Sequence, residues 1–159
     1  PLESTSIWMI QTGIARLLQN FPDARFGAPE RDRYNRLMVE ESELIRDFLV
    51  LQYHVTERDD TPFWRYCRSM EIPERLAEKL RVFRSTGRCF RENDELFNDT
   101  SWFAVLHGQK LLPERFDPVA ELLSEAETRD RLLHIRGAVA NSLAVMPSHA
   151  DFIAQHCAA

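Results

Sequence analysis

The chain has 159 residues, of which 44% are hydrophobic and 28% charged, a composition typical of a soluble globular protein. Its net charge of -5, with no block of Lys or Arg, argues against a nucleic-acid-binding protein, which needs a clustered basic surface. No apolar run is long enough to span a membrane. The three cysteines are odd in number and far apart, which indicates free thiols in a reducing, cytoplasmic compartment.

Two long helices are predicted at the start of the chain. Apolar residues of the first helix recur at helical spacing, namely Ile7, Ile10, Ile14, Leu17, Leu18 and Phe21. Ser4 or Thr5 can cap its start, and Pro22 ends it. A longer amphipathic helix is predicted over residues 29–54, beginning with the proline of the stretch PERDRYNR.

Two shorter helices follow, and each has a start or stop signal. Asp60 or Thr61 is expected to cap the first of them, with Pro62 in its first turn. The second begins at Pro73 and ends at Gly87, a residue suited to the left-handed conformation that closes many helices.

The last third of the chain is also predicted to be helical. Residues 89–101 are predicted to form a loop, because they are polar and show no regular period, and a short apolar helix is predicted over 101–109. A helix is predicted over 120–146, and a final one over 148–157 is capped by Ser148. Strict alternation of apolar and polar residues is absent, so we predict an all-α protein with a single helical domain over residues 1–159.

Aromatic residues are numerous for a simple helical bundle. The chain has ten Phe and three Trp: Trp8, Trp64 and Trp102. These side chains can fill the core, and some can instead line an aromatic pocket. Trp102 and its neighbour Phe103 are the candidates for pocket walls, with a core role as the alternative.

The opening letters PLEST place an acid at the mouth of the first helix. Backbone amides in the first turn of a helix attract anions, so the amides of Thr5, Ser6 and Ile7 are a candidate site for a small anion or the electron-rich edge of a ring. Glu3 would then lie beside the anion as a base or a hydrogen-bond acceptor. The simpler interpretation is that Glu3 only favours the helix dipole, an effect worth about 0.3–1 kcal/mol.

Three stretches in this order resemble the C-terminal part of the flavin-dependent tryptophan halogenases. They are PLESTSIWMIQTGIARLLQNFPD, YHVTERDDTPFWRYCR and GQKLLPERFDP, and the likeness runs from Pro1 to about Pro118. The resemblance implies that Glu3 is the catalytic glutamate beside an indole-type substrate. It also implies that the amides of Thr5 and Ser6 bind chloride or bromide, although the family often has Gly where Ser6 stands. In the family, hypohalous acid made at reduced FAD is the halogenating species, and a flavin reductase supplies the reduced flavin.

Other family features are absent from this sequence. It contains neither a GxGxxG dinucleotide motif nor a WxWxIP stretch, and its two lysines, Lys79 and Lys110, match no family motif for the catalytic lysine. We therefore expect residues 1–159 to be a C-terminal fragment of a halogenase that neither binds FAD nor is active by itself.

The segment before residue 101 bears on the substrate. Tryptophan-specific relatives have a longer aromatic stretch there, whereas this chain has only DELFNDTSW. The resemblance therefore implies an indole or phenol substrate that is larger or less polar than free tryptophan.

Two further groups of polar residues were considered as sites. Asp59 and Asp60 suit acid–base chemistry or a metal, but their place before Thr-Pro favours helix capping. His149, His156 and Cys157 lack the fourth ligand and the tight spacing of a zinc site, so no metal is expected.

A different class of function also fits the sequence. The chain would then be a helical interaction module that forms homo-oligomers through an exposed apolar face of the first helix. The first helix discriminates between the two functions. In a whole halogenase it is expected to pack on the flavin domain, so without that domain Ile7, Trp8, Ile10 or Ile14 would be exposed.

Overall fold

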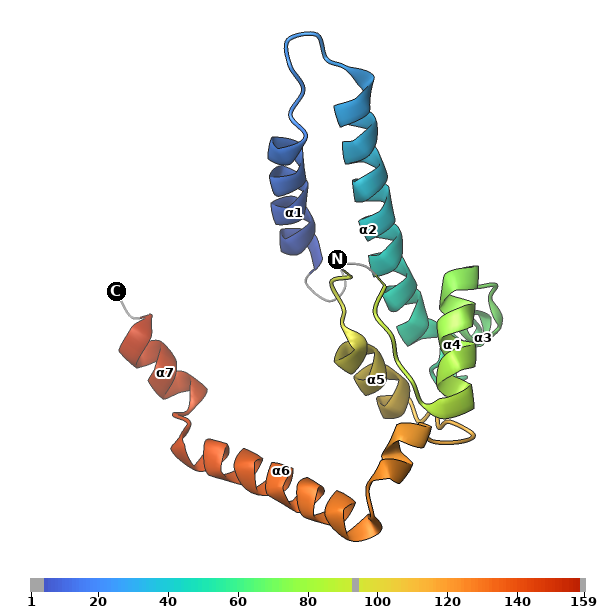
Figure 1. Cartoon of the computed structure of the whole chain (residues 1–159), viewed down its shortest axis with the longest axis vertical. Helices are drawn as coiled ribbons and strands as arrows, with labels where there is room; N and C mark the ends of the chain where they lie inside the picture. The colour runs from blue at the N-terminus through green and yellow to red at the C-terminus, as the bar shows by residue number, and fades with distance from the viewer. Residues whose placement is uncertain (1–4, 93–94, 158–159) are drawn as a thin grey trace. The chain divides into compact units, whose positions relative to one another are not determined.

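The protein is described by a computed structural model that covers residues 5–92 and 95–157. Within these ranges it consists of helices and connecting turns, with no strand, which confirms the all-α prediction. The elements are shown in Figure 1: α1 (Thr5–Gln19), α2 (Ala28–His54), α3 (Pro62–Ser69), α4 (Glu74–Thr86), α5 (Asp99–Gly108), the 3₁₀ helix η2 (Pro118–Leu122), α6 (Glu125–Val145) and α7 (His149–His156).

The predicted helix boundaries are mostly confirmed. Thr61, rather than Asp60, is the N-cap of α3, and its hydroxyl accepts a hydrogen bond from the amide of Trp64 at 3.4 Å. Gly87 ends α4 with φ of 72°, in the left-handed region. Ser148 caps α7 as expected.

The helix predicted over residues 120–146 begins later than expected. Ser124 and Glu127 form a capping box, in which the Ser124 hydroxyl accepts from the Glu127 amide and the Glu127 carboxylate accepts from the Ser124 amide. This cap starts α6 at Glu125 and leaves the preceding residues as the separate 3₁₀ turn η2.

The chain separates into two compact units, residues 1–117 and 118–159. The prediction of one helical domain over 1–159 therefore stays a prediction, and each unit is described by itself. The second unit contains η2, α6 and α7, and none of these helices buries a residue.

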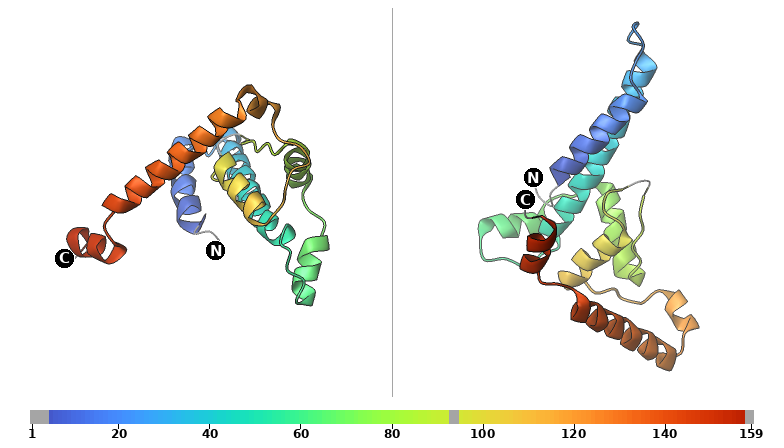
Figure 2. Two further views of the ribbon diagram at one scale, coloured as in Figure 1. Left: turned by 90° about the horizontal axis from the view of Figure 1, so that it is seen from below. Right: turned by 90° about the vertical axis from the view of Figure 1, so that its left-hand side faces the viewer.

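In the first unit, α1 folds back beside α2 as a hairpin, and α3 and α4 pack on α2 (Figures 1 and 2). The core lies where α2, α4 and α5 meet. It is formed by Phe48 and Leu51 of α2, Leu76, Leu80 and Phe83 of α4, and Trp102 and Leu106 of α5.

A buried carboxylate also joins α2 to α4. Asp47 is only 2% exposed, and its Oδ2 accepts hydrogen bonds from Arg75 Nε at 2.9 Å and Nη2 at 2.8 Å. Arg46 donates to the other oxygen, Oδ1, at 2.8 Å. Both oxygens of the buried charge are therefore satisfied, as burial of a carboxylate requires.

Candidate functional site

The candidate anion site lies at the first turn of α1. The helix begins at Thr5, which is buried, and Ser6 is partly buried. The amides of these two residues therefore lie at the positive end of a fifteen-residue helix. Glu3, the predicted catalytic glutamate, lies outside the described residues, so its role stays a prediction, as does halide binding by Thr5 and Ser6.

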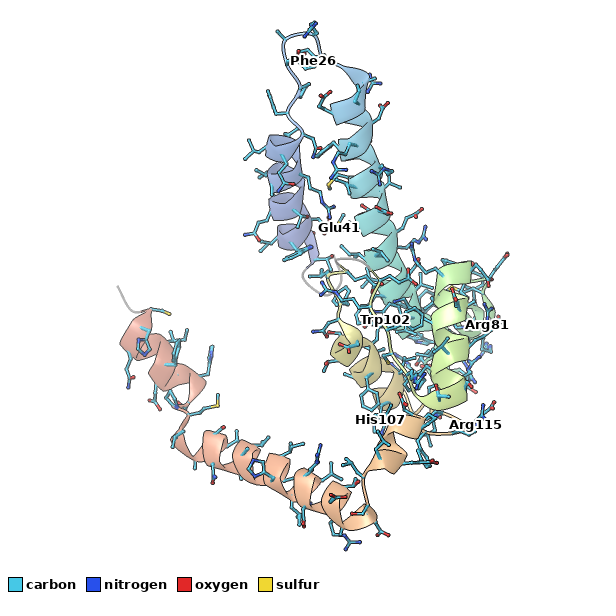
Figure 3. The ribbon with its side chains drawn as sticks, in the orientation of Figure 1. Phe26, Glu41, Arg81, Trp102, His107 and Arg115 are labelled. Carbon is cyan, nitrogen blue, oxygen red and sulfur yellow. The ribbon has the colours of Figure 1, made fainter. Side chains whose placement is uncertain are left out.

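Polar side chains hold α1 against α2. Glu41 of α2 is 5% exposed and lies on the side of its helix that faces α1 (Figure 3). Its Oε1 accepts from Trp8 Nε1 at 2.7 Å. Its Oε2 accepts from Thr12 Oγ1 at 3.0 Å and from the Arg16 guanidinium, which also donates to the Leu37 carbonyl at 3.0 Å.

The apolar side of α1 is turned away from α2. Ile7 is 68% exposed, Ile10 62% and Ile14 55%, so the apolar stripe identified in the sequence is not part of the core of this chain. Gly13 lies on the α2 side instead, where an added Cβ would be 3.4 Å from Met38 Cε. The two helices thus approach closely through small and polar residues.

Trp102, a candidate pocket wall, lies in the core. It is 2% exposed and packs edge-on against Phe48, with ring centroids 5.2 Å apart. The cavity beside it holds about 10 Å³, room for one water molecule at most and not for an aromatic substrate. In this structure Trp102 has the core role that the sequence left open as the alternative.

A buried ion pair fixes the Trp102 ring. Lys79 Nζ donates to Glu95 Oε1 at 2.8 Å and to the Phe90 carbonyl at 2.9 Å. The other oxygen of Glu95 accepts from Trp102 Nε1 at 3.2 Å, and the ammonium lies 4.6 Å from the centre of the Trp102 ring. The loop before α5 is therefore tied to α4 through a charge pair and a cation–π contact.

Phe103, the other candidate wall, is 48% exposed. Its ring stacks on His107 at 5.5 Å and meets Phe83 edge-on at 6.3 Å. Neighbouring positions on α5 thus send one aromatic ring inward and one toward the surface. The role of Trp102 and Phe103 in binding a substrate stays a prediction.

One hollow of the hairpin is far from the start of α1. It measures about 280 Å³ and lies at the hairpin tip, lined by Leu17, Phe21, Phe26 and Tyr34 among others. Because α1 rises about 1.5 Å per residue, its fifteen residues separate this hollow from Thr5 by roughly 20 Å. The hollow is therefore not part of the candidate anion site.

Asp60, which was considered as an acid–base or metal residue, and His54 at the end of α2 both contact neighbouring groups of the chain. Asp60 forms a two-point ion pair with Arg58, whose hydrogen bonds lower the pKa of the Asp60 carboxyl. His54 Nδ1 lies 3.2 Å from the Cys67 carbonyl. Among residues 5–92 and 95–157, no three His, Cys, Asp or Glu side chains are grouped so that they could hold a metal ion.

Sequence reasoning missed Glu41 and Lys79. Each interrupts an apolar stripe: Glu41 lies between Leu37 and Ile45 at four-residue intervals, and Lys79 stands three residues after Leu76. A charged residue on the buried side of a helix needs a partner, and this signal was available in the sequence.

The chain does not fit the dinucleotide part of a flavin. Its glycines are isolated: Gly13 and Gly137 lie within helices, Gly87 and Gly108 near helix ends, and Gly27 caps α2, which has Pro29 in its first turn. They do not form a loop of closely spaced glycines ahead of a helix, the arrangement that brings backbone amides to a pyrophosphate.

No helix in the described part of the chain is long and apolar enough to cross a membrane.

Comparisons with known proteins match this arrangement. The family model described as tryptophan halogenase matches residues 1–125. The structure of Xcc4156, a flavin-dependent halogenase from Xanthomonas campestris, has a TM-score of 0.95 and 46% identity over 100% of this chain and 32% of its own. BrvH, a flavin-dependent halogenase from Brevundimonas sp. BAL3, has a TM-score of 0.91 and 41% identity, covering 98% of this chain and 32% of its own.

A curated protein gives the same assignment. Tryptophan 6-halogenase ThaL from Streptomyces albogriseolus is 36% identical over 127 residues, which cover 71% of this chain and 24% of that protein. The chain thus spans about a third or less of the length of these relatives. The family match over residues 1–125, together with these likenesses, shows that the chain belongs to the flavin-dependent tryptophan halogenase family.

Proposed function

We propose that this chain carries the halide site and the catalytic carboxylate of a halogenase that chlorinates or brominates an indole or another aromatic compound. The observation that carries the proposal is the start of α1, where PLEST places Glu3 directly before a helix whose first residue, Thr5, is buried. Partial burial strengthens the attraction of amides for an anion, because less water competes for it.

The amides of Thr5 and Ser6 hold the halide in this proposal. They carry no net charge and no titratable proton, so halide binding at this site is nearly independent of pH in the neutral range. Ser6 occupies a position where the family often has Gly, and a serine amide donates as a glycine amide does.

Glu3 acts on the aromatic ring. Replacement of a ring hydrogen by an electrophilic halogen leaves a proton on the attacked carbon, and the Glu3 carboxylate accepts that proton as the aromatic ring is restored. A carboxylate beside the ring also stabilises the positive charge that develops there.

A reduced flavin supplies the oxidising chemistry, with O₂ and the halide, when it is bound. Because the glycines of this chain do not form a dinucleotide loop, the flavin is held by protein outside this chain in the proposal. By itself the chain is therefore inactive, and a flavin reductase serves the whole enzyme.

Two observations support an aromatic substrate other than free tryptophan. The segment ahead of α5 is short, and Asn98 already caps that helix through the Ser101 amide. Identity to the flavin-dependent halogenases Xcc4156 and BrvH, 46% and 41%, also exceeds the 36% shared with the tryptophan 6-halogenase ThaL.

The test is Glu3→Gln in the full-length protein, supplied with reduced flavin, chloride or bromide, and a panel of indoles and phenols. Loss of acid–base help lowers kcat by about 10²–10⁴-fold. Glu30→Gln is the matched control, because Glu30 is also an acid in the first turn of a helix. If both variants keep near-normal turnover, Glu3 is only a helix-start acid.

A second candidate function rests on the exposed stripe of α1, where Ile7, Ile10 and Ile14 are all more than half exposed. In this proposal the chain self-associates through that stripe and has no catalytic role. Light scattering of the chain and of Ile10→Glu decides it: a dimer that the substitution converts to a monomer supports self-association, and a monomer in both excludes it.

A further inference from the structure

We propose that Glu41 is a positioning residue for the halide site, acting through Trp8 on the first turn of α1. The inference rests on the proposed function, because the halide site is taken to be the amides of Thr5 and Ser6. It concerns a residue of α2 that lies well away from those amides along the sequence.

The contacts of Glu41 fix α1 in two ways. Trp8, Thr12 and Arg16 follow one another at intervals of four, so they share one side of α1, and all three donate to the same carboxylate. Trp8 binds Oε1, whereas the other two bind Oε2. Donors spread over two turns on two oxygens set both the rotation of α1 and its position along α2.

This attachment is unusual because α1 has apolar residues available for packing. Ile7, Ile10 and Ile14 are exposed. The side chains that hydrogen-bond to Glu41 of α2 do so through the polar groups of Trp8, Thr12 and Arg16. A buried charged pair adds little net stability compared with well-packed apolar residues, but its directional bonds select one geometry. The contact therefore suits orientation better than it suits stabilisation.

Trp8 is the link to the halide site. It follows Thr5 by three residues, about 4.5 Å along the helix axis, and so lies less than one turn from the proposed site. A helix is stiff over such a distance, and rotation of Trp8 about the axis turns the first-turn amides with it. Displacements of about 1 Å at a reacting centre can reduce rates by about 10²-fold.

The experiment compares Glu41→Gln, Trp8→Phe and Glu40→Gln in the full-length protein. Glu41→Gln keeps the shape of the side chain but replaces one acceptor oxygen by a donor. Trp8→Phe removes the Nε1 donor and part of the ring of Trp8, which is 39% exposed, while it keeps an aromatic side chain there. Glu40→Gln is the matched control, because Glu40 directly precedes Glu41 on α2 but is exposed and pairs with Arg36.

The readout is the KM for chloride, measured separately from kcat at saturating chloride, together with chlorine NMR line broadening on titration with sodium chloride. Glu41→Gln is expected to raise the chloride KM at least about tenfold and to weaken the broadening, with a smaller rise for Trp8→Phe. Glu40→Gln leaves both unchanged. The double variant Glu41→Gln, Trp8→Phe is expected to raise the chloride KM no more than Glu41→Gln alone, because both substitutions act on one contact.

A purely structural role gives a different result. It lowers the melting temperature and the fraction of active protein, so the apparent kcat falls while the chloride KM does not change. That outcome overturns the inference. If Glu41→Gln does not fold, Trp8→Phe decides the question by the same measure.

Failure of the proposed function is recognised separately. If the wild-type protein shows no chloride-dependent halogenation and no chlorine line broadening, the halide site itself is wrong. If the wild type shows saturable chloride dependence but Trp8→Phe and Glu41→Gln keep its chloride KM, only the positioning role of Glu41 is refuted.

Discussion

The two lysines of this chain form a natural comparison between a buried and an exposed ion pair. Each donates to a glutamate: Lys79 to Glu95 at 2.8 Å and Lys110 to Glu57 at 2.9 Å. The side chains of the first pair are 6% and 3% exposed, whereas those of the second are 74% and 65% exposed. The distances are nearly equal, so burial is the main difference.

Lys79→Met is expected to destabilise the protein strongly. The substitution leaves the Glu95 carboxylate buried with only neutral donors, the Trp102 indole at 3.2 Å and the Glu92 amide at 3.0 Å. Leaving one member of a buried pair without its partner costs about 3–5 kcal/mol in the free energy of unfolding. For a protein of this size the melting temperature falls by about 6–20 °C.

Lys110→Met serves as the control and is expected to leave the free energy of unfolding unchanged, because solvent screens the exposed pair. Urea denaturation followed by tryptophan fluorescence measures both variants, and Trp102 reports directly on the altered region. The double variant Lys79→Met, Glu95→Leu is expected to be more stable than Lys79→Met, because it removes the stranded charge. The reasoning is refuted if Lys79→Met costs no more than Lys110→Met.

Two further predictions follow from single residues. Gly87→Ala is expected to lower the free energy of unfolding by about 1–2 kcal/mol, because φ is 72° and the new Cβ would lie 3.2 Å from Pro113 Cγ. Gly137→Ala is expected to stabilise α6, because the new Cβ would have nothing within 4 Å. Thermal melts followed by circular dichroism compare the two variants, and equal effects on stability would contradict the argument. Burial, and secondarily the charge of Asp99, raise the pKa of the Cys89 thiol to about 11, so at pH 8 about a thousandth of this thiol is thiolate. Mass spectrometry after iodoacetamide treatment is expected to find the exposed Cys157 alkylated before Cys89. Alkylation of Cys89 first would show that its thiol is not protected.

Local signals predicted the helices well. Pro62 with Thr61 ahead of it, and Gly87 after an apolar stripe, act through neighbouring backbone groups, so the sequence alone identifies them. The late start of α6 was missed because Ser124 and Glu127 form a capping box within a stretch that otherwise has helical spacing.

The sequence pattern could not predict which side of α1 packs against α2. Its apolar stripe predicts burial, but within this chain the neighbouring helix α2 contacts the other side of α1 through Glu41. Which side of an amphipathic helix meets which neighbour is a tertiary property, and periodicity shows only that two sides exist. The catalytic role of Glu3 and the halide-binding role of Thr5 and Ser6 rest on the resemblance and stay predictions, because a dipole effect is the simpler explanation of one acid before a helix.

The absence of buried residues in α6 affects how this helix melts. Its 21 residues include no buried side chain, so its order depends on the Ser124 cap and on hydrogen bonds within the helix. Such a helix follows helix–coil behaviour, fraying gradually from its ends, and its melting exposes little new apolar surface and so adds little heat capacity. Calorimetry is therefore expected to detect mainly the cooperative unfolding of the core formed by α2, α4 and α5. The helical circular dichroism signal is expected to decrease gradually at lower temperatures, because α6 frays before the core unfolds.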